Sequence, residues 1–73
     1  MTDKSLDLRR EICPRSLILT MSTIKTLEKG DVLSVEATDE TMRKAVPKLC
    51  ERAGFELLEM KEEGGSIRFR IRK

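Results

Sequence analysis

The chain has 73 residues, which is the length of one small domain, so we expect a single domain over residues 1–73. Fifteen Lys and Arg against thirteen Asp and Glu leave a net charge of +2, too small to indicate a nucleic-acid-binding protein by itself. The sequence has no His, which excludes a histidine general base, a Cys–His nucleophile pair and histidine-ligated zinc sites.

The first expected strand covers residues 4–9, where polar and apolar side chains alternate. We expect residues 1–4 to be disordered. A helix is expected over residues 14–29, because Leu17, Met21, Ile24 and Leu27, flanked by Ile18, recur near a 3.6-residue period. Pro14 suits its first turn, where the missing N–H costs nothing, and Gly30 suits its end.

The second expected strand covers residues 31–37, with Leu33, Val35 and Ala37 on one face. A second helix follows, and its apolar stripe is the clearest in the chain: Met42, Ala45, Val46, Leu49, Cys50 and Ala53. Pro47 allows two interpretations: it lies in the first turn of a helix that starts near Ala45, or it kinks one that starts near Thr41. Gly54 predicts the end of this helix.

Residues 55–61 and 66–72, joined through residues 62–65, are typical of a hairpin. In its second strand Ile67, Phe69 and Ile71 alternate with Arg68, Arg70 and Arg72, so one face is apolar and the other basic. The order β-α-β-α-β-β predicts an α+β fold, a two-layer sandwich with both helices on one face of a four-stranded mixed sheet. The other face of the sheet is expected to contact water.

Cys13 is the first candidate for chemistry. If Pro14 is the first helical residue, Cys13 is the N-cap, at the positive end of the helix dipole, which favours the thiolate. Arg15, Arg9 and Arg10 add positive charge, and Glu11 opposes them. A strand-to-helix turn is normally exposed, so the sulfur should be accessible to a protein partner. The alternative is that Cys13 is a small buried apolar residue.

Cys50 is expected to pack in the core rather than to react, because it lies on the apolar stripe of the second helix. The alternative is that Cys50 is a second relay thiol or forms an oxidised pair with Cys13. Asp7 and Asp39 are expected to serve turns and caps.

No signal peptide and no apolar run of roughly 20 residues is present, so we expect a reduced, soluble, cytoplasmic protein. No metal or other cofactor is expected.

The chain resembles the TusA/SirA-type (YeeD/YhhP-like) small sulfur-carrier proteins over nearly its whole length. The resemblance rests on Cys13-Pro14 opening a helix and on five further segments: Leu6-Asp7, Lys29-Gly30-Asp31, Thr38-Asp39, Val46-Pro47-x-x-Cys50 and Ile71-Arg72-Lys73. It implies the same sandwich fold, with a proline in the second helix. It also implies that Cys13 accepts a persulfide from a cysteine desulfurase or another donor protein and passes it to an acceptor protein.

The known destinations in this family are tRNA thiolation, molybdenum-cofactor maturation and sulfur oxidation. The family motif is Cys-Pro-x-Pro with a glycine three residues before the Cys. Here Arg10 replaces that glycine, Arg15 stands at x and Ser16 replaces the second proline, while Ala45 replaces an Asp two residues before Pro47. We therefore expect Pro14, Arg15 and Ser16 to start the helix or stabilise the thiolate. Arg9 and Arg10 are expected to dock partners.

Two other functions remain open from the sequence. A nucleic-acid-binding module would contact phosphates through Arg68, Arg70 and Arg72, together with Lys73, but no aromatic side chain is available there to stack on bases. Glu56 or Glu59 on the adjacent strand is expected to pair with these arginines. A redox-regulatory docking protein would instead form a sulfenate or mixed disulfide on Cys13. We expect a monomer that relays persulfide with partner enzymes.

Overall fold

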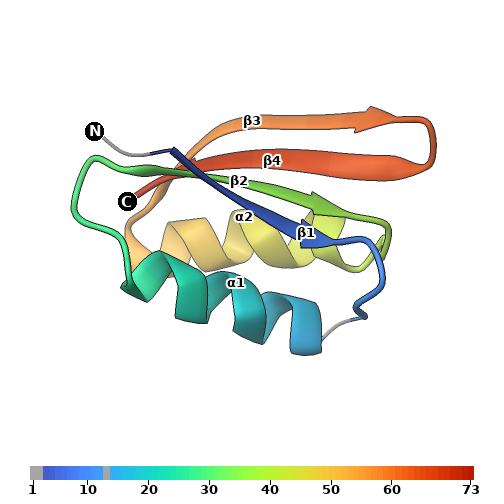
Figure 1. Cartoon of the computed structure of the whole chain (residues 1–73), viewed down its shortest axis with the longest axis horizontal. Helices are drawn as coiled ribbons and strands as arrows, with labels where there is room; N and C mark the ends of the chain where they lie inside the picture. The colour runs from blue at the N-terminus through green and yellow to red at the C-terminus, as the bar shows by residue number, and fades with distance from the viewer. Residues whose placement is uncertain (1–2, 13) are drawn as a thin grey trace.

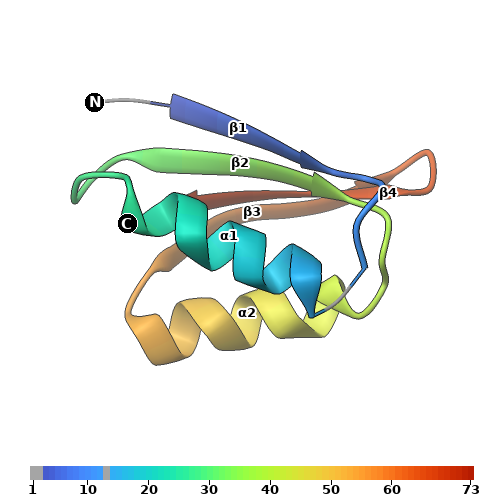
Figure 2. The same ribbon diagram turned by 60° about the horizontal axis from the view of Figure 1, so that its bottom comes forward.

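A computed structural model describes residues 3–12 and 14–73. In these residues the strands are β1 (Asp3–Leu8), β2 (Val32–Ala37), β3 (Glu56–Glu63) and β4 (Ser66–Arg72), and the helices are α1 (Arg15–Lys25) and α2 (Met42–Ala53). The strands form one sheet in the order β1-β2-β4-β3, with β1 and β2 parallel and the other neighbours antiparallel. Both helices cover the same face (Figures 1 and 2). The predicted two-layer α+β sandwich is confirmed.

Alternation along the strands places apolar side chains on the helix side of the sheet. The central strands β2 and β4 supply the buried residues Leu33, Val35, Ala37, Ile67, Phe69 and Ile71. The helices add Ile24, Met42, Val46 and Cys50 to the same core. The opposite face carries the polar residues of each strand, as expected. β1 begins at Asp3, which pairs with Val32, so residues 3 and 4 belong to a strand rather than to a disordered end.

α1 ends earlier than predicted. The N–H of Thr26 donates to the carbonyl of Thr23 at 3.0 Å, and its hydroxyl donates to the same carbonyl at 2.6 Å. These i→i−3 bonds tighten and close the last turn, so the helix ends at Lys25. Gly30, predicted as the stop, instead lies in the following loop with φ +99, and its N–H donates to the carbonyl of Lys73.

The buried face of α1 also differs from the predicted stripe. Ser16, Thr20 and Ile24 are the buried residues of this helix, while Leu17 and Met21 are only half-buried. Ile18 is 60% exposed. The physical reason is that small side chains at positions 16 and 20 let the helix lie close to the sheet. The leucines beside them then fill the edges of the contact.

α2 begins at Met42 and contains Pro47, which agrees with the interpretation of a helix starting near Thr41. Proline cannot donate the N–H that this position would normally offer to the carbonyl of Arg43. Gly54 ends the helix as predicted: it has φ +77, and its N–H donates to the carbonyl of Cys50. Gly64 and Gly65, both with positive φ, form the two-residue turn between β3 and β4.

Candidate functional site

The loop of residues 9–14 joins β1 to α1 and contains Cys13. Cys13 itself lies outside the described residues, so its predicted reactivity stays a prediction. Among its neighbours, Arg9, Arg10, Ile12 and Pro14 are exposed. The loop follows the carboxyl end of β1, which is paired in parallel with β2, so it lies beside the loop that follows β2. The prediction that this turn lies at the surface is confirmed for its described residues.

The start of α1 differs by one residue from the prediction. Arg15, rather than Pro14, is the first helical residue, and Pro14 occupies the N-cap position, so the prediction of Cys13 as the N-cap is wrong. Proline fits either position because neither uses its N–H in the helix. The N–H of Ser16 donates to the carbonyl of Ile12 at 3.1 Å, and that of Ile18 to the carbonyl of Pro14 at 3.0 Å. The positive end of the α1 dipole therefore faces the loop that contains Cys13.

Two of the three arginines around this loop form ion pairs with nearby carboxylates. Arg15 donates through Nε to Glu11 at 3.2 Å, so part of its charge is neutralised. Arg9 forms a two-point ion pair with Asp7, through Nε at 3.0 Å and a terminal nitrogen at 2.9 Å. Arg10 is exposed and has no ion pair among the described residues. The unpaired charge near the loop is thus contributed by Arg10 and the helix dipole.

Asp7 fixes the beginning of the loop, which confirms its predicted turn role. Besides the ion pair, its carboxylate accepts the backbone N–H of Arg9 at 3.1 Å. These hydrogen bonds from Arg9 lower the pKa of Asp7 from 3.8 to about 2. Since the folded pKa lies below the unfolded value, the pair stabilises the fold fully above about pH 4, and this contribution is lost as the pH falls towards 2.

We expect Asp7→Asn to flatten the acid side of the stability curve. The wild-type protein should lose more stability than the variant between pH 4 and pH 2, because only the wild type has this carboxylate to protonate. Urea unfolding at several pH values measures this difference. Arg9→Gln should have the same effect, and combining both changes should add nothing further. A wild-type curve parallel to that of Asp7→Asn over this range would contradict the ion pair.

Thr38 is a site residue that composition and spacing did not identify. Its hydroxyl donates to the backbone carbonyl of Arg9 at 2.8 Å and so ties the loop after β2 to the loop that contains Cys13. The following residue, Asp39, accepts the N–H of Thr41 at 3.0 Å, which is a turn role rather than a cap, because the N-cap of α2 is Thr41. The Thr38-Asp39 pair was visible in the sequence only through the family resemblance.

Ser16 is fully buried in the first turn of α1. Its hydroxyl has no hydrogen-bond partner among the residues that the structure describes, although the hydroxyl of Thr20 donates to the Ser16 carbonyl at 2.9 Å. An unpaired buried hydroxyl destabilises a protein by about 1–3 kcal/mol. The sequence predicted a role for Ser16 in the helix start or the thiolate, and only the first-turn position is visible here.

We expect Ser16→Ala to raise the stability by about 1 kcal/mol, since it removes this hydroxyl and introduces a better helix former. For a domain of this size, that corresponds to a rise in Tm of roughly 4–8 °C. Thr20→Val is the matched control, because its hydroxyl is already paired, and it should stabilise less. Thermal unfolding followed by circular dichroism compares the two variants. A loss of stability in Ser16→Ala would contradict the finding that the Ser16 hydroxyl is unpaired.

Cys50 lies in the core, as predicted. It is 3% exposed on the buried side of α2, and burial raises the pKa of its thiol. Both effects disfavour the reactive thiolate at neutral pH. Cys50 is therefore a poor sulfur acceptor in the folded protein.

The arginines of β4 lie on the open face of the sheet, but opposite acidic residues. In the strand register Arg68 faces Glu36 on β2, Arg70 faces Glu59 and Arg72 faces Glu56. On its β3 side Arg68 faces Lys61, which itself pairs with Glu63. Arg72 also forms an ion pair with Glu56, which confirms the expectation that Glu56 or Glu59 pairs with these arginines. Lys73 does not belong to this face, because its Nζ donates to the carbonyl of Leu27 at 2.7 Å. The charge balance argues against a phosphate-binding surface.

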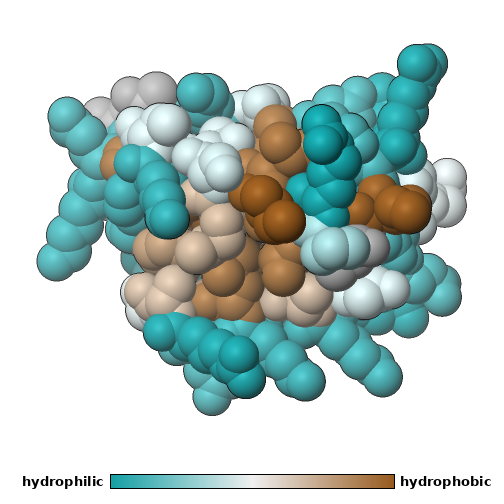
Figure 3. Space-filling view, turned by 90° about the horizontal axis from the view of Figure 1, so that it is seen from below, coloured by the Kyte–Doolittle hydropathy of each residue, from teal (hydrophilic) through white to brown (hydrophobic). Residues whose placement is uncertain are grey.

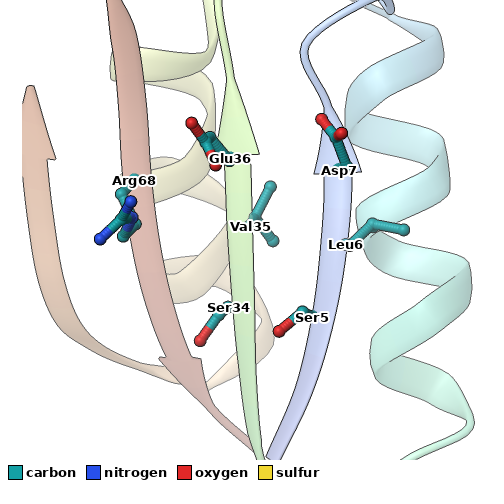
Figure 4. A pocket seen from close by; sticks show the side chains of 7 residues that line it. All are labelled: Ser5, Leu6, Asp7, Ser34, Val35, Glu36 and Arg68. Atoms are coloured by element: carbon teal, nitrogen blue, oxygen red, sulfur yellow. The ribbon is translucent and has the colours of Figure 1, made fainter. Parts of the chain in front are cut away.

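A shallow polar groove of about 430 Å³ crosses the same face. Ser5 and Ser34 lie side by side on β1 and β2, with Asp7, Glu36 and Arg68 around them (Figure 4). Its carboxylates already have partners, since Asp7 binds Arg9 and Glu36 accepts the hydroxyl of Ser66 at 3.1 Å. Among the described residues, none with a sulfur-reactive group lines this groove.

Within residues 3–12 and 14–73, no three Cys, Asp or Glu side chains come together in a way that would hold a metal ion. Neither helix in this part of the chain is long and apolar enough to cross a membrane.

The chain is similar to known proteins over nearly its whole length. Residues 4–73 match the family model of sulfurtransferase TusA. The chain is 37% identical over 71 residues to the sulfur carrier protein TusA of Pseudomonas putida strain W619, an alignment that covers 97% of this chain and 89% of the relative. The sulfur carrier protein TusA of Pseudomonas entomophila is 38% identical over the same length and coverage. That of Pseudomonas aeruginosa PAO1 is 37% identical over 97% of this chain and 90% of the relative. The chain therefore belongs to the TusA sulfurtransferase family.

Proposed function

We propose that this protein is a sulfur carrier that accepts a persulfide on Cys13 and passes the terminal sulfur to an acceptor protein. The proposal is supported by the Cys13-Pro14 pair before α1, within a chain of the TusA family; the described residues on either side of Cys13, Ile12 and Pro14, are exposed. The three relatives from Pseudomonas described above bear the name sulfur carrier protein. Cys50, which is the other cysteine of the chain, is buried.

Persulfide transfer needs only a cysteine thiolate and a surface position that the donor can reach. The Cys13 thiolate attacks the terminal sulfur of the donor persulfide, the S–S bond of the donor breaks, and the donor cysteine leaves as a thiolate. Repeating the exchange with an acceptor thiolate returns Cys13 to its free form. The α1 dipole and Arg10 favour the negatively charged sulfur, whereas Glu11 limits the contribution of Arg15.

The donor is a cysteine desulfurase or another protein persulfide, and the acceptor serves tRNA thiolation, cofactor sulfuration or other sulfur metabolism. We propose that the protein acts as a monomer in the cytoplasm, where thiols remain reduced. Arg9 and Arg10 supply positive charge for docking. Pro14 and Ser16 shape the start of α1, which follows Cys13 in the sequence.

Intact-protein mass spectrometry tests the proposal. After incubation with a cysteine desulfurase, its cofactor and cysteine, the wild-type protein should gain about 32 Da, and a reductant should remove the adduct. Polysulfide should load the same adduct without an enzyme. No adduct from either source would contradict the proposal. A gain of about 16 Da alone, the sulfenate, would favour the redox-regulatory function.

A further inference from the structure

The charged side chains are divided unequally between the two faces of the molecule. Helices α1 and α2 together carry six Lys and Arg but only one acidic residue, Glu51. On the open face of the sheet, the described residues have four Lys and Arg, at positions 61, 68, 70 and 72, against six Asp and Glu, at positions 3, 7, 36, 56, 59 and 63. The small net charge of +2 therefore conceals a basic helix side and an acidic sheet side.

Most of the cations on the helices are free to bind a partner. Arg15 and Arg43 already pair with nearby carboxylates. The other four are exposed and form no ion pair among the described residues: Lys25, Lys44, Lys48 and Arg52. We name these four the helix-side cations. The three that belong to α2 recur every four residues, so they form a row on the side of α2 turned away from its buried residues.

Apolar side chains occupy the centre of the same side of the molecule. Figure 3 shows this centre, with hydrophilic side chains projecting around it. Leu17 and Met21 on α1 and Leu49 on α2 are half-buried. Ile18 is 60% exposed. An apolar centre with a cationic margin is typical of a surface that lies on a membrane, because Lys and Arg stems extend along apolar groups while their charges reach the lipid headgroups.

We propose that the helix side of this protein binds the surface of a membrane that contains anionic phospholipids. The helix-side cations contact the lipid phosphates, and the apolar centre lies against the headgroup boundary. The acidic sheet side is repelled by the same surface, so the charge distribution orients the molecule with α1 and α2 towards the lipid. This inference does not depend on the proposed function, since it involves neither Cys13 nor a sulfur donor.

Other occupants fit this face less well. A nucleic acid would leave the apolar centre uncovered, and Phe69, the aromatic residue of the core cluster, is fully buried and cannot stack on bases. A second copy of this chain would place its own helix-side cations against these, and like charges repel. A folded acidic protein normally offers side chains to concave sites, whereas the grooves described on the open face and at the hairpin turn are not lined by the helix-side cations.

Vesicle sedimentation tests the proposal with two triple variants of equal net charge. Lys44→Gln/Lys48→Gln/Arg52→Gln removes the row on α2, and Lys61→Gln/Arg68→Gln/Arg70→Gln removes three charges from the open face of the sheet. All six side chains lie outside the core, so both variants should fold, and circular dichroism checks this.

At low salt the wild-type protein should sediment with phosphatidylglycerol vesicles but not with phosphatidylcholine vesicles. The α2 variant should bind phosphatidylglycerol roughly a hundredfold more weakly, because each cation near an anionic surface contributes about fivefold. The sheet variant should stay within about fivefold of wild type. Salt at about 1 M, where the Debye length is about 3 Å, should release the wild-type protein.

The other outcomes would overturn the proposal. Absence of wild-type binding to phosphatidylglycerol, or equal binding to both lipids, would exclude an anionic surface as the partner. Equal losses in the two variants would show that only net charge matters and not the helix side. Binding to an RNA duplex, or a dimer in sedimentation velocity, that the α2 variant loses while no vesicle is bound would assign this face to a nucleic acid or to a second copy instead.

Discussion

Cys13→Ser is expected to abolish the sulfur adduct of about 32 Da that the wild-type protein forms with a persulfide donor. A hydroxyl is not ionised at neutral pH and does not attack a persulfide sulfur. The described neighbours of position 13 are exposed, so a donor can approach it. Ser is close to Cys in size, so the fold should be retained, and circular dichroism checks this.

Cys50→Ser is the matched control and should keep the adduct. Cys50 is 3% exposed, and burial raises the pKa of its thiol, so it contributes little thiolate in the folded protein. The change places a polar hydroxyl in the core and is expected to lower stability by about 1–3 kcal/mol. Loading is therefore measured well below the unfolding temperature of this variant. An adduct that survives Cys13→Ser and disappears in Cys50→Ser would reverse the two assignments.

Phe69→Ala is expected to lower the free energy of unfolding by about 3–5 kcal/mol. Phe69 is fully buried in β4, a central strand, and is paired with Val35 of β2 and Met60 of β3. With two Phe and no Tyr or Trp in the chain, no other aromatic side chain of the core cluster is fully buried. A domain of this size buries only about 60% of its surface, so this loss is expected to leave a substantial unfolded fraction at 25 °C.

Two variants separate this cavity effect from a general sensitivity of the sheet. Phe69→Leu keeps most of the volume and should cost less than Phe69→Ala. Leu58→Ala, at the irregularity in the edge strand β3, removes a side chain that is 39% exposed and should cost about 1 kcal/mol or less. Urea unfolding is followed by far-ultraviolet circular dichroism, because the chain has no Trp or Tyr. Equal losses in Phe69→Ala and Leu58→Ala would contradict the described core.

The strands and the order of elements could be predicted because their patterns are strong. Ile67, Phe69 and Ile71 alternate with arginines, and this period of two leaves one choice of buried face. The buried face of α1 was harder to predict from the sequence. An apolar stripe predicted Leu17 and Met21 as core residues, whereas Ser16 and Thr20 are the buried ones. Hydrophobicity does not reveal that a helix needs small residues where it lies close to a sheet.

The candidate site was only partly predictable for a related reason. The sequence located the Cys-Pro pair and the charged residues around it, but it does not show which side chains point toward each other. The ion pair of Arg15 with Glu11 could not be predicted for this reason. The same holds for Lys73, which binds the carbonyl of Leu27 instead of lying on the open face. Thr38 lies 29 residues from Arg9 in the chain, and only the parallel pairing of β1 and β2 brings their loops together.

The most direct measurement locates the sulfur in the wild-type protein. Trypsin cuts after Lys and Arg, so Cys13 falls in the peptide of residues 11–15 and Cys50 in that of residues 49–52. After loading from a cysteine desulfurase and alkylation of free thiols and persulfides, peptide mass spectrometry should find the added sulfur on residues 11–15 alone. Sulfur on residues 49–52, or on neither peptide, would contradict Cys13 as the carrier residue.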